Sequence, residues 1–109
     1  MVELNIKAKD YFIIAEIAEK MAKFDVACTN YFKSLTAIND FILSQINFFP
    51  KDHHERFEML KEKHPFLYKI TSSLFLTYRR AYTHEINKDE TLALKNKIKE
   101  AFQYAKITI

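Results

Sequence analysis

Residues 25–46 read DVACTNYFKSLTAINDFILSQI, and their apolar side chains recur at steps of three and four residues. This spacing places them on one face of an α-helix, where they can be buried together. Asp25 is the expected N-cap, and the helix is expected to end before Pro50, because the residue preceding a proline avoids the α region. The predicted helix is ~35 Å long, and its buried stripe consists of Cys28, Phe32, Leu35, Ile38, Ile42 and Ile46, widened by Tyr31 and Phe41.

The segments on either side predict one long and one short helix. The long one runs from about Leu4 to Ala22, and its alanine-rich stripe permits close approach by a neighbouring helix. The short one runs from Asp52 to Lys63, with Asp52 as N-cap and Glu55 at the capping-box position. Its few apolar residues predict a surface position. The stripe of the long helix is Leu4, Ala8, Tyr11, Phe12, Ala15, Ala18 and Ala22.

The remainder of the chain predicts two more long helices. Pro65 opens the first of them, at a position that proline favours. The last helix begins around Asn87 to Asp89, and Asn87 with Glu90 again has the capping-box spacing. Both segments carry an apolar stripe, formed by Leu67, Ile70, Leu74, Phe75, Tyr78 and Tyr82 in the first and by Leu94, Ile98, Ala101, Phe102 and Ala105 in the last.

Glycine is absent from the 109 residues, whereas average usage of about 7% would supply several. Hairpin turns and phosphate-cradling loops depend on the positive φ that glycine adopts without steric cost. Its absence therefore argues against an all-β fold, a Walker loop and a dinucleotide-binding turn. We predict an all-α fold, an up-down bundle of four long helices plus one short helix, in a single domain spanning residues 1–109.

Charge and cysteine content exclude few function classes. Seventeen Lys and Arg residues against 14 Asp and Glu give a net charge of +3, which does not by itself indicate a nucleic-acid-binding protein. The single cysteine, Cys28, has no partner for an internal disulfide and is expected to be a buried thiol. No apolar run approaches the ~18 residues of a membrane span, and no signal peptide is visible, so we expect a cytoplasmic protein without membrane contact.

Residues 78–84 read YRRAYTH and set Arg79 and His84 five positions apart. A fixed cation beside an imidazole that titrates near neutral pH is sufficient equipment to cut RNA without a metal, because RNA supplies its own 2′-hydroxyl nucleophile. In this hypothesis His84 takes the hydroxyl proton, and Arg79 binds the phosphate and stabilises the pentacoordinate state. Arg80 would add phosphate affinity. The expected products are a 2′,3′-cyclic phosphate and a 5′-hydroxyl.

The spacing leaves the geometry of this pair open. Five positions on a regular helix correspond to ~140° of rotation and ~7.5 Å of rise, so Arg79 and His84 do not face one point. They converge if the helix ends or tightens near Tyr82 and Thr83, or if two chains pair. The alternative is a solvated Arg79 and a helix-end His84 that interacts favourably with the helix dipole.

Other residues with the potential for chemistry have simpler interpretations. His53, His54 and His64 lack a usual ligand spacing, so we predict no metal site and a polar surface helix. Most of the ten Phe and six Tyr residues are expected in the core. Phe48 and Phe49, just before Pro50, are the exception and are expected to form an exposed patch used in association.

Four segments of the chain together resemble the HEPN domain family, the helical domain of prokaryotic toxin–antitoxin modules, defence systems and nucleotidyltransferase partners. They are residues 8–12 (AKDYF), 30–37 (NYFKSLTA), 76–84 (LTYRRAYTH) and 101–105 (AFQYA). The third segment matches the family's motif of an arginine, four to six residues and a histidine. The resemblance implies a four- or five-helix bundle that is usually a homodimer, with the Arg/His pairs near the dimer cleft and metal-independent RNase activity. Wide apolar stripes on the second and third long helices also predict a homodimer.

Three functions therefore remain open, and the third of them is a helical bundle that serves only as an assembly scaffold. The first is an RNase that needs no cofactor, with Arg79 and His84 as catalytic residues and Arg80 as a phosphate ligand. The second is a non-catalytic HEPN-like module that binds a nucleotidyltransferase-type partner protein or a nucleotide. Arg80 favours the second, because active members of the family often carry Asn, Asp or His straight after the motif arginine. Ile86 stands where toxins silenced by adenylylation carry a tyrosine, which argues against that control.

Overall fold

The computed structural model describes residues 3–109, and the regular structure in that range is helical. One short and four long helices follow one another, as the sequence predicts. They are α1 (Leu4–Lys20), α2 (Phe24–Ser44), α3 (His53–Lys63), α4 (Pro65–Arg80) and α5 (Lys88–Ala105). Within this range no helix is both long enough and apolar enough to cross a membrane.

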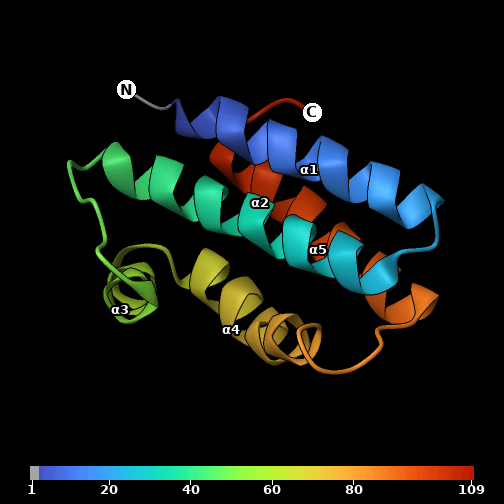
Figure 1. Ribbon diagram of the computed structural model, residues 1–109. Coiled ribbons are helices and arrows are strands. Elements are labelled where there is room, and N and C mark those ends of the chain that lie inside the picture. Colours follow the sequence, from blue (N-terminus) through green and yellow to red (C-terminus); the bar gives the residue numbers. More distant parts are fainter. Residues whose placement is uncertain (1–2) are drawn as a thin grey trace.

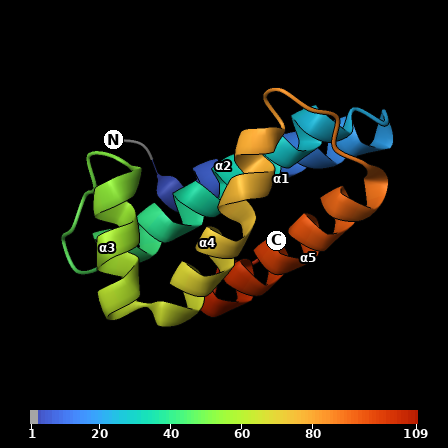
Figure 2. The same ribbon diagram turned by 90° about the horizontal axis from the view of Figure 1, so that it is seen from below.

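Helix α2 is central and packs against each of the other four helices. Helices α1 and α5 run beside it, and α3 is seen end-on below it (Figure 1). Seen from below, α4 lies across α2 between α3 and α5 (Figure 2). The α2 stripe is buried against these neighbours, with Cys28, Leu35 and Ile38 fully inaccessible. The buried side of α2 is therefore occupied by contacts within the chain. Of the two helices on which the dimer prediction depends, α4 exposes the large apolar residues Phe66 and Leu76, and α2 exposes Val26.

Small residues bring α1 and α2 close together, as the alanine-rich stripe predicts. Ala8 and Ala15 are fully buried, and the Ser34 hydroxyl donates a hydrogen bond to the Ala8 carbonyl at 2.7 Å. At the other end of α1, the Tyr31 hydroxyl donates to Glu19 at 2.6 Å. Tyr31 and Phe32 of the aromatic pair both lie in the core. The sequence prediction that these aromatic residues form the core is therefore confirmed.

Cys28 is a buried thiol, as expected. Its side chain is inaccessible, and its Sγ lies 4.0 Å from the carbonyl of Thr77 on α4. Burial, followed by the charge of Glu90, raises the pKa of Cys28 to about 11. The sulfur therefore stays protonated at neutral pH and acts as a small apolar group that packs between α2 and α4.

The start of α2 and the last residue of its predicted stripe differ from the sequence prediction. The helix begins at Phe24, its N-cap is Lys23, and no side chain caps it. Asp25 lies in the first turn instead, where its charge still complements the helix dipole. The helix ends at Ser44, before Pro50 as predicted, so Ile46 lies beyond it and is 49% exposed. The backbone turns on through Asn47, which adopts a φ of 59°.

The predicted N-caps of α3 and α5 are confirmed, but Glu55 accepts from the Lys51 N–H and does not complete a capping box with Asp52. The Asp52 carboxylate accepts a hydrogen bond from the Glu55 backbone at 2.9 Å. Asn87 and Glu90 form a reciprocal capping box at the start of α5. Two details differ from the prediction: α3 buries Leu60 fully, and Tyr82 lies past the end of α4 and is 62% exposed. Of the aromatic pair before Pro50, Phe49 is 67% exposed, whereas Phe48 packs against the core.

The chain makes left-handed turns without glycine. Ala22, Asn47 and Lys106 adopt φ values of 57°, 59° and 59°. Asn tolerates this region, but for residues such as Ala and Lys it costs roughly 1 kcal/mol or more. We therefore expect Ala22→Gly to raise the free energy of unfolding by about 1 kcal/mol in urea denaturation. Ala93→Gly, at an exposed position inside α5, is the control and should lower it by about the same amount. A destabilised Ala22→Gly protein would contradict the prediction.

Candidate functional site

The end of α4 carries the residues that the sequence motif singled out. Arg79 and Arg80 are the last residues of the helix, and the backbone then tightens. The N–H groups of Tyr82 and Thr83 bond to the carbonyls three residues before them, at 3.3 and 3.1 Å. The His84 N–H bonds to the Arg80 carbonyl at 2.8 Å. The expected helix end near Tyr82 and Thr83 is therefore present, and His84 remains attached to the last helical turn.

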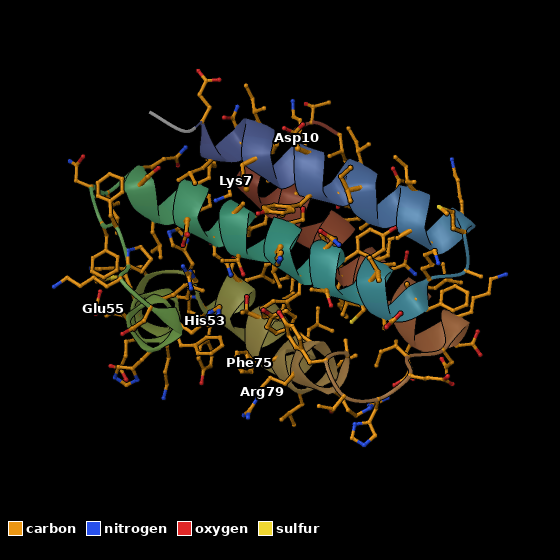
Figure 3. The ribbon with its side chains drawn as sticks, in the orientation of Figure 1. Lys7, Asp10, His53, Glu55, Phe75 and Arg79 are labelled. Carbon is orange, nitrogen blue, oxygen red and sulfur yellow. The ribbon has the colours of Figure 1, made fainter. Side chains whose placement is uncertain are left out.

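Arg79 and His84 are both exposed, and within residues 3–109 no hydrogen bond or ion pair joins their side chains. The Arg79 side chain projects from α4 on the side away from α1 (Figure 3). The Nδ1 atom of His84 lies 2.8 Å from the hydroxyl of the neighbouring Thr83. A single chain thus presents the two groups at one helix end without direct contact between them.

Arg80 forms an ion pair with Glu90 and so ties the end of α4 to the first turn of α5. The hydrogen bond from Arg80, followed by one from the Asn87 backbone, lowers the pKa of Glu90 below its usual value. Glu90 therefore stays ionised at neutral pH. A phosphate that binds Arg80 would have to share the guanidinium with this carboxylate or displace it.

An exposed face surrounds the pair. Leu76, Arg79, Arg80 and Thr83 are spaced at three and four residues and share one side of the helix end. Leu76 is 74% exposed, and the neighbouring Tyr82 is 62% exposed. Two large apolar groups thus flank the arginines, and we call these five residues the α4-end face. Such a mixture of apolar and arginine residues suits association with another macromolecule.

A second candidate site lies where four helices meet. Its cavity of about 190 Å³ is lined by side chains of α1, α2, α3 and α4, and we call it the four-helix cleft. Lys7 of α1 and His53 of α3 lie on opposite sides of α2 (Figure 3). The polar lining residues are Lys7, Tyr11, Lys33, Thr36, Asp40, His53 and Tyr78.

A largely buried ion pair supports one wall of this cleft. Nε and Nη2 of Arg56 donate to the two carboxylate oxygens of Asp40, at 2.6 and 3.1 Å. Nη1 of Arg56 lies 2.9 Å from Nδ1 of His53. Because a guanidinium only donates, Nδ1 of His53 is the acceptor and the ring hydrogen is on Nε2. His53 is exposed, as the sequence predicts, but its contact with Arg56 and Asp40 could not be predicted, because Asp40 lies on a different helix.

A larger groove of about 1000 Å³ lies between α1, α5 and the C-terminal residues. Its floor is apolar and includes Phe12 and Phe102, whereas Lys9, Lys99 and Lys106 lie at its rim. Within residues 3–109, no three His, Cys, Asp or Glu side chains gather closely enough to hold a metal ion. Ile13 of α1, which is 53% exposed, also lines this groove.

Two histidines make the stability of the fold depend on pH. Burial, followed by the charge of Arg56, lowers the pKa of His53 below 6.5, and burial lowers that of His64. The unfolded chain therefore binds protons at a higher pH than the folded chain. The stabilisation is present above pH 6.5 and is lost as the pH falls through the two lowered values.

We expect the free energy of unfolding to fall between about pH 7 and about pH 5.5. Urea denaturation across this range measures it, with His53→Gln/His64→Gln as the control. The control variant should show a flatter dependence, because its chain lacks the two groups that take up protons on unfolding. An unchanged slope in the variant would show that other groups are responsible.

Comparisons with protein-family models, with curated proteins and with solved structures find no match for this chain. The resemblance to the HEPN family therefore stays a prediction that depends on the residues quoted above. The α4-end face and the four-helix cleft are the two features from which a function can be inferred.

Proposed function

We propose that this protein is a metal-independent endoribonuclease of the HEPN type, a toxin or defence component that acts as a homodimer. One observation carries the proposal. An arginine and a histidine are exposed five residues apart at the same helix end, and a hydroxyl lies 2.8 Å from Nδ1 of the histidine. A fixed cation and an oriented imidazole are the groups that transesterification of RNA requires.

The tautomer of His84 determines its role. When Nδ1–H donates to the Thr83 hydroxyl, the lone pair is on Nε2 and can accept the 2′-hydroxyl proton. The 2′-oxygen then bonds to phosphorus, and the bond to the 5′-oxygen breaks. The imidazolium returns its proton to the departing oxygen, so that the products are a 2′,3′-cyclic phosphate and a 5′-hydroxyl. Arg79 binds the phosphate throughout and stabilises the charge of the pentacoordinate state.

The α4-end face supports dimerisation beside these groups. Leu76 and Tyr82 are large, exposed and adjacent to Arg79. A two-fold axis near them would bury both apolar groups and bring the Arg79 of one chain toward the His84 of its partner. This arrangement accounts for the lack of contact between the two side chains within a single chain.

The test is cleavage of RNA by the purified protein in EDTA. His84→Ala is expected to slow cleavage at least about 100-fold, the usual loss when a general base is removed. His54→Ala is the matched control, because His54 is an exposed histidine on α3, and it should keep wild-type activity. Equal rates for the wild type and His84→Ala would reject the catalytic assignment.

The second candidate is a non-catalytic HEPN-like module that binds a nucleotidyltransferase-type protein or a nucleotide. Two observations favour it. Arg80 is already paired with Glu90, and the outer side of α1 exposes apolar residues that a partner protein would cover. These exposed apolar residues are Ile6, Ile13, Ile14, Ile17 and Met21. Co-purification with such a partner, together with the failure to cleave any RNA in EDTA, would favour this candidate over the enzyme.

A further inference from the structure

The four-helix cleft gathers positive charge. Lys7 from α1 and Lys33 from α2 each hold the ammonium nitrogen 5.9 Å from the centroid of the Tyr11 ring. Both line the cavity, so two cations lie near one aromatic side chain at its wall. The carboxylate of Asp40 also lines it, but two nitrogens of Arg56 already bind both of its oxygens. The ion pair is neutral overall, and the two lysines therefore set the charge of the cleft.

His53 adds a directed donor to this pair of cations. Its Nδ1 accepts from Arg56, which assigns the ring hydrogen to Nε2. The nearby carboxylates at the start of α3 are engaged with backbone groups. Asp52 accepts from the Glu55 N–H at 2.9 Å, and Glu55 accepts from the Lys51 N–H at 3.0 Å. Two ammonium groups and one N–H donor from three helices thus line a single cavity.

We propose that the four-helix cleft binds the phosphate monoester of a nucleotide or of an oligonucleotide end, held by Lys7, Lys33 and His53. A monoester carries a charge of about −1.5 to −2 near neutral pH and offers three strong acceptor oxygens, which matches two cations and one donor. The cavity of about 190 Å³ accommodates a phosphate and part of a sugar, since one water takes up ~30 Å³. The site does not depend on cleavage by Arg79 and His84.

The experiment titrates ¹⁵N-labelled protein and follows its NMR spectrum. The probes are inorganic phosphate, adenosine monophosphate and short deoxyoligonucleotides with a 5′-phosphate or a 5′-hydroxyl. Deoxy strands lack the 2′-hydroxyl, so that cleavage cannot interfere. Shifts should concentrate at Lys7, Lys33 and His53, and the phosphorylated strand should bind about tenfold more tightly than the hydroxyl strand. Equal affinity for the two strands would overturn the proposal.

Two double variants isolate the site. Lys7→Gln/Lys33→Gln should weaken binding of adenosine monophosphate at least about tenfold, because it removes both charge-assisted contacts. Lys69→Gln/Lys88→Gln removes the same number of exposed lysines outside the cleft and should leave the affinity unchanged. Equal weakening in both variants would indicate general attraction by surface charge and would reject the site. The RNase proposal is unaffected by that outcome, since it is decided by His84→Ala.

Discussion

Mixing the Arg79→Ala and His84→Ala proteins is expected to restore RNA cleavage that neither variant performs alone. Within one chain the two side chains make no contact, and both are exposed at the end of α4. If a site combines Arg79 of one subunit with His84 of the other, a mixed dimer contains one intact site and one site that lacks both groups. Random exchange makes half of the dimers mixed, so about a quarter of the wild-type rate should return.

The measurement is the rate of RNA cleavage in EDTA after the two variants have exchanged subunits. A mixture of His84→Ala with the double variant Arg79→Ala/His84→Ala is the control, because no dimer in it retains an intact His84. It should remain inactive. A mixture that stays inactive although each variant is dimeric would reject the shared site and leave only a site within one chain.

Asp40→Ala is expected to lower the free energy of unfolding by about 3 kcal/mol, because it leaves the Arg56 charge without a partner. The Arg56 side chain is 11% exposed and that of Asp40 is 22% exposed, so water replaces the lost carboxylate poorly. The pair also joins α2 to α3, and its loss should loosen α3 and the orientation of His53. Urea denaturation measures the loss, and hydrogen exchange of the α3 amides locates it.

The matched control removes the whole pair and not only one partner. Asp40→Leu/Arg56→Met replaces two buried charges with apolar groups of similar length. It should lose much less stability than Asp40→Ala, and it is expected to be within about 1 kcal/mol of the wild type. If the double variant is as unstable as Asp40→Ala, the cost lies in lost packing and not in an unpaired charge.

The helices could be predicted because their signals are local. Apolar residues at three- and four-residue steps predicted the buried side of α2. Asp52, Pro65 and Asn87 predicted the starts of three helices. Each of these signals depends on residues within one or two turns of each other. The all-α fold therefore followed from short-range patterns together with the absence of glycine.

The start of α2 was harder to predict, because tertiary packing overrides weak local preferences. Asp25 is a better cap than Lys23 by propensity, yet the helix begins before it. Ala22 and Lys106 make turns for which glycine is usual. Ala22 connects two packed helices and Lys106 follows the packed α5, so tertiary packing compensates for the strained backbone at positions that a scan for turn residues cannot detect.

The two candidate sites also differ in how far the sequence could predict them. Arg79 and His84 lie close together in the sequence, so their motif was visible, although their relative orientation was not. The four-helix cleft could not be predicted from the sequence, because its side chains come from four helices. Lys7 and Tyr78, for example, are separated by most of the chain. Nothing in the residues around His53 indicates that Arg56 and Asp40 orient its ring.

The sulfur packed between α2 and α4 has a practical consequence. Alkylating reagents need a thiolate that they can reach, whereas Cys28 is inaccessible and its pKa is raised to about 11. Its modification therefore requires the two helices to separate. The rate at which iodoacetamide reacts with the native protein would therefore report how often α2 and α4 separate. The cysteine is thus a built-in probe of local opening in the core.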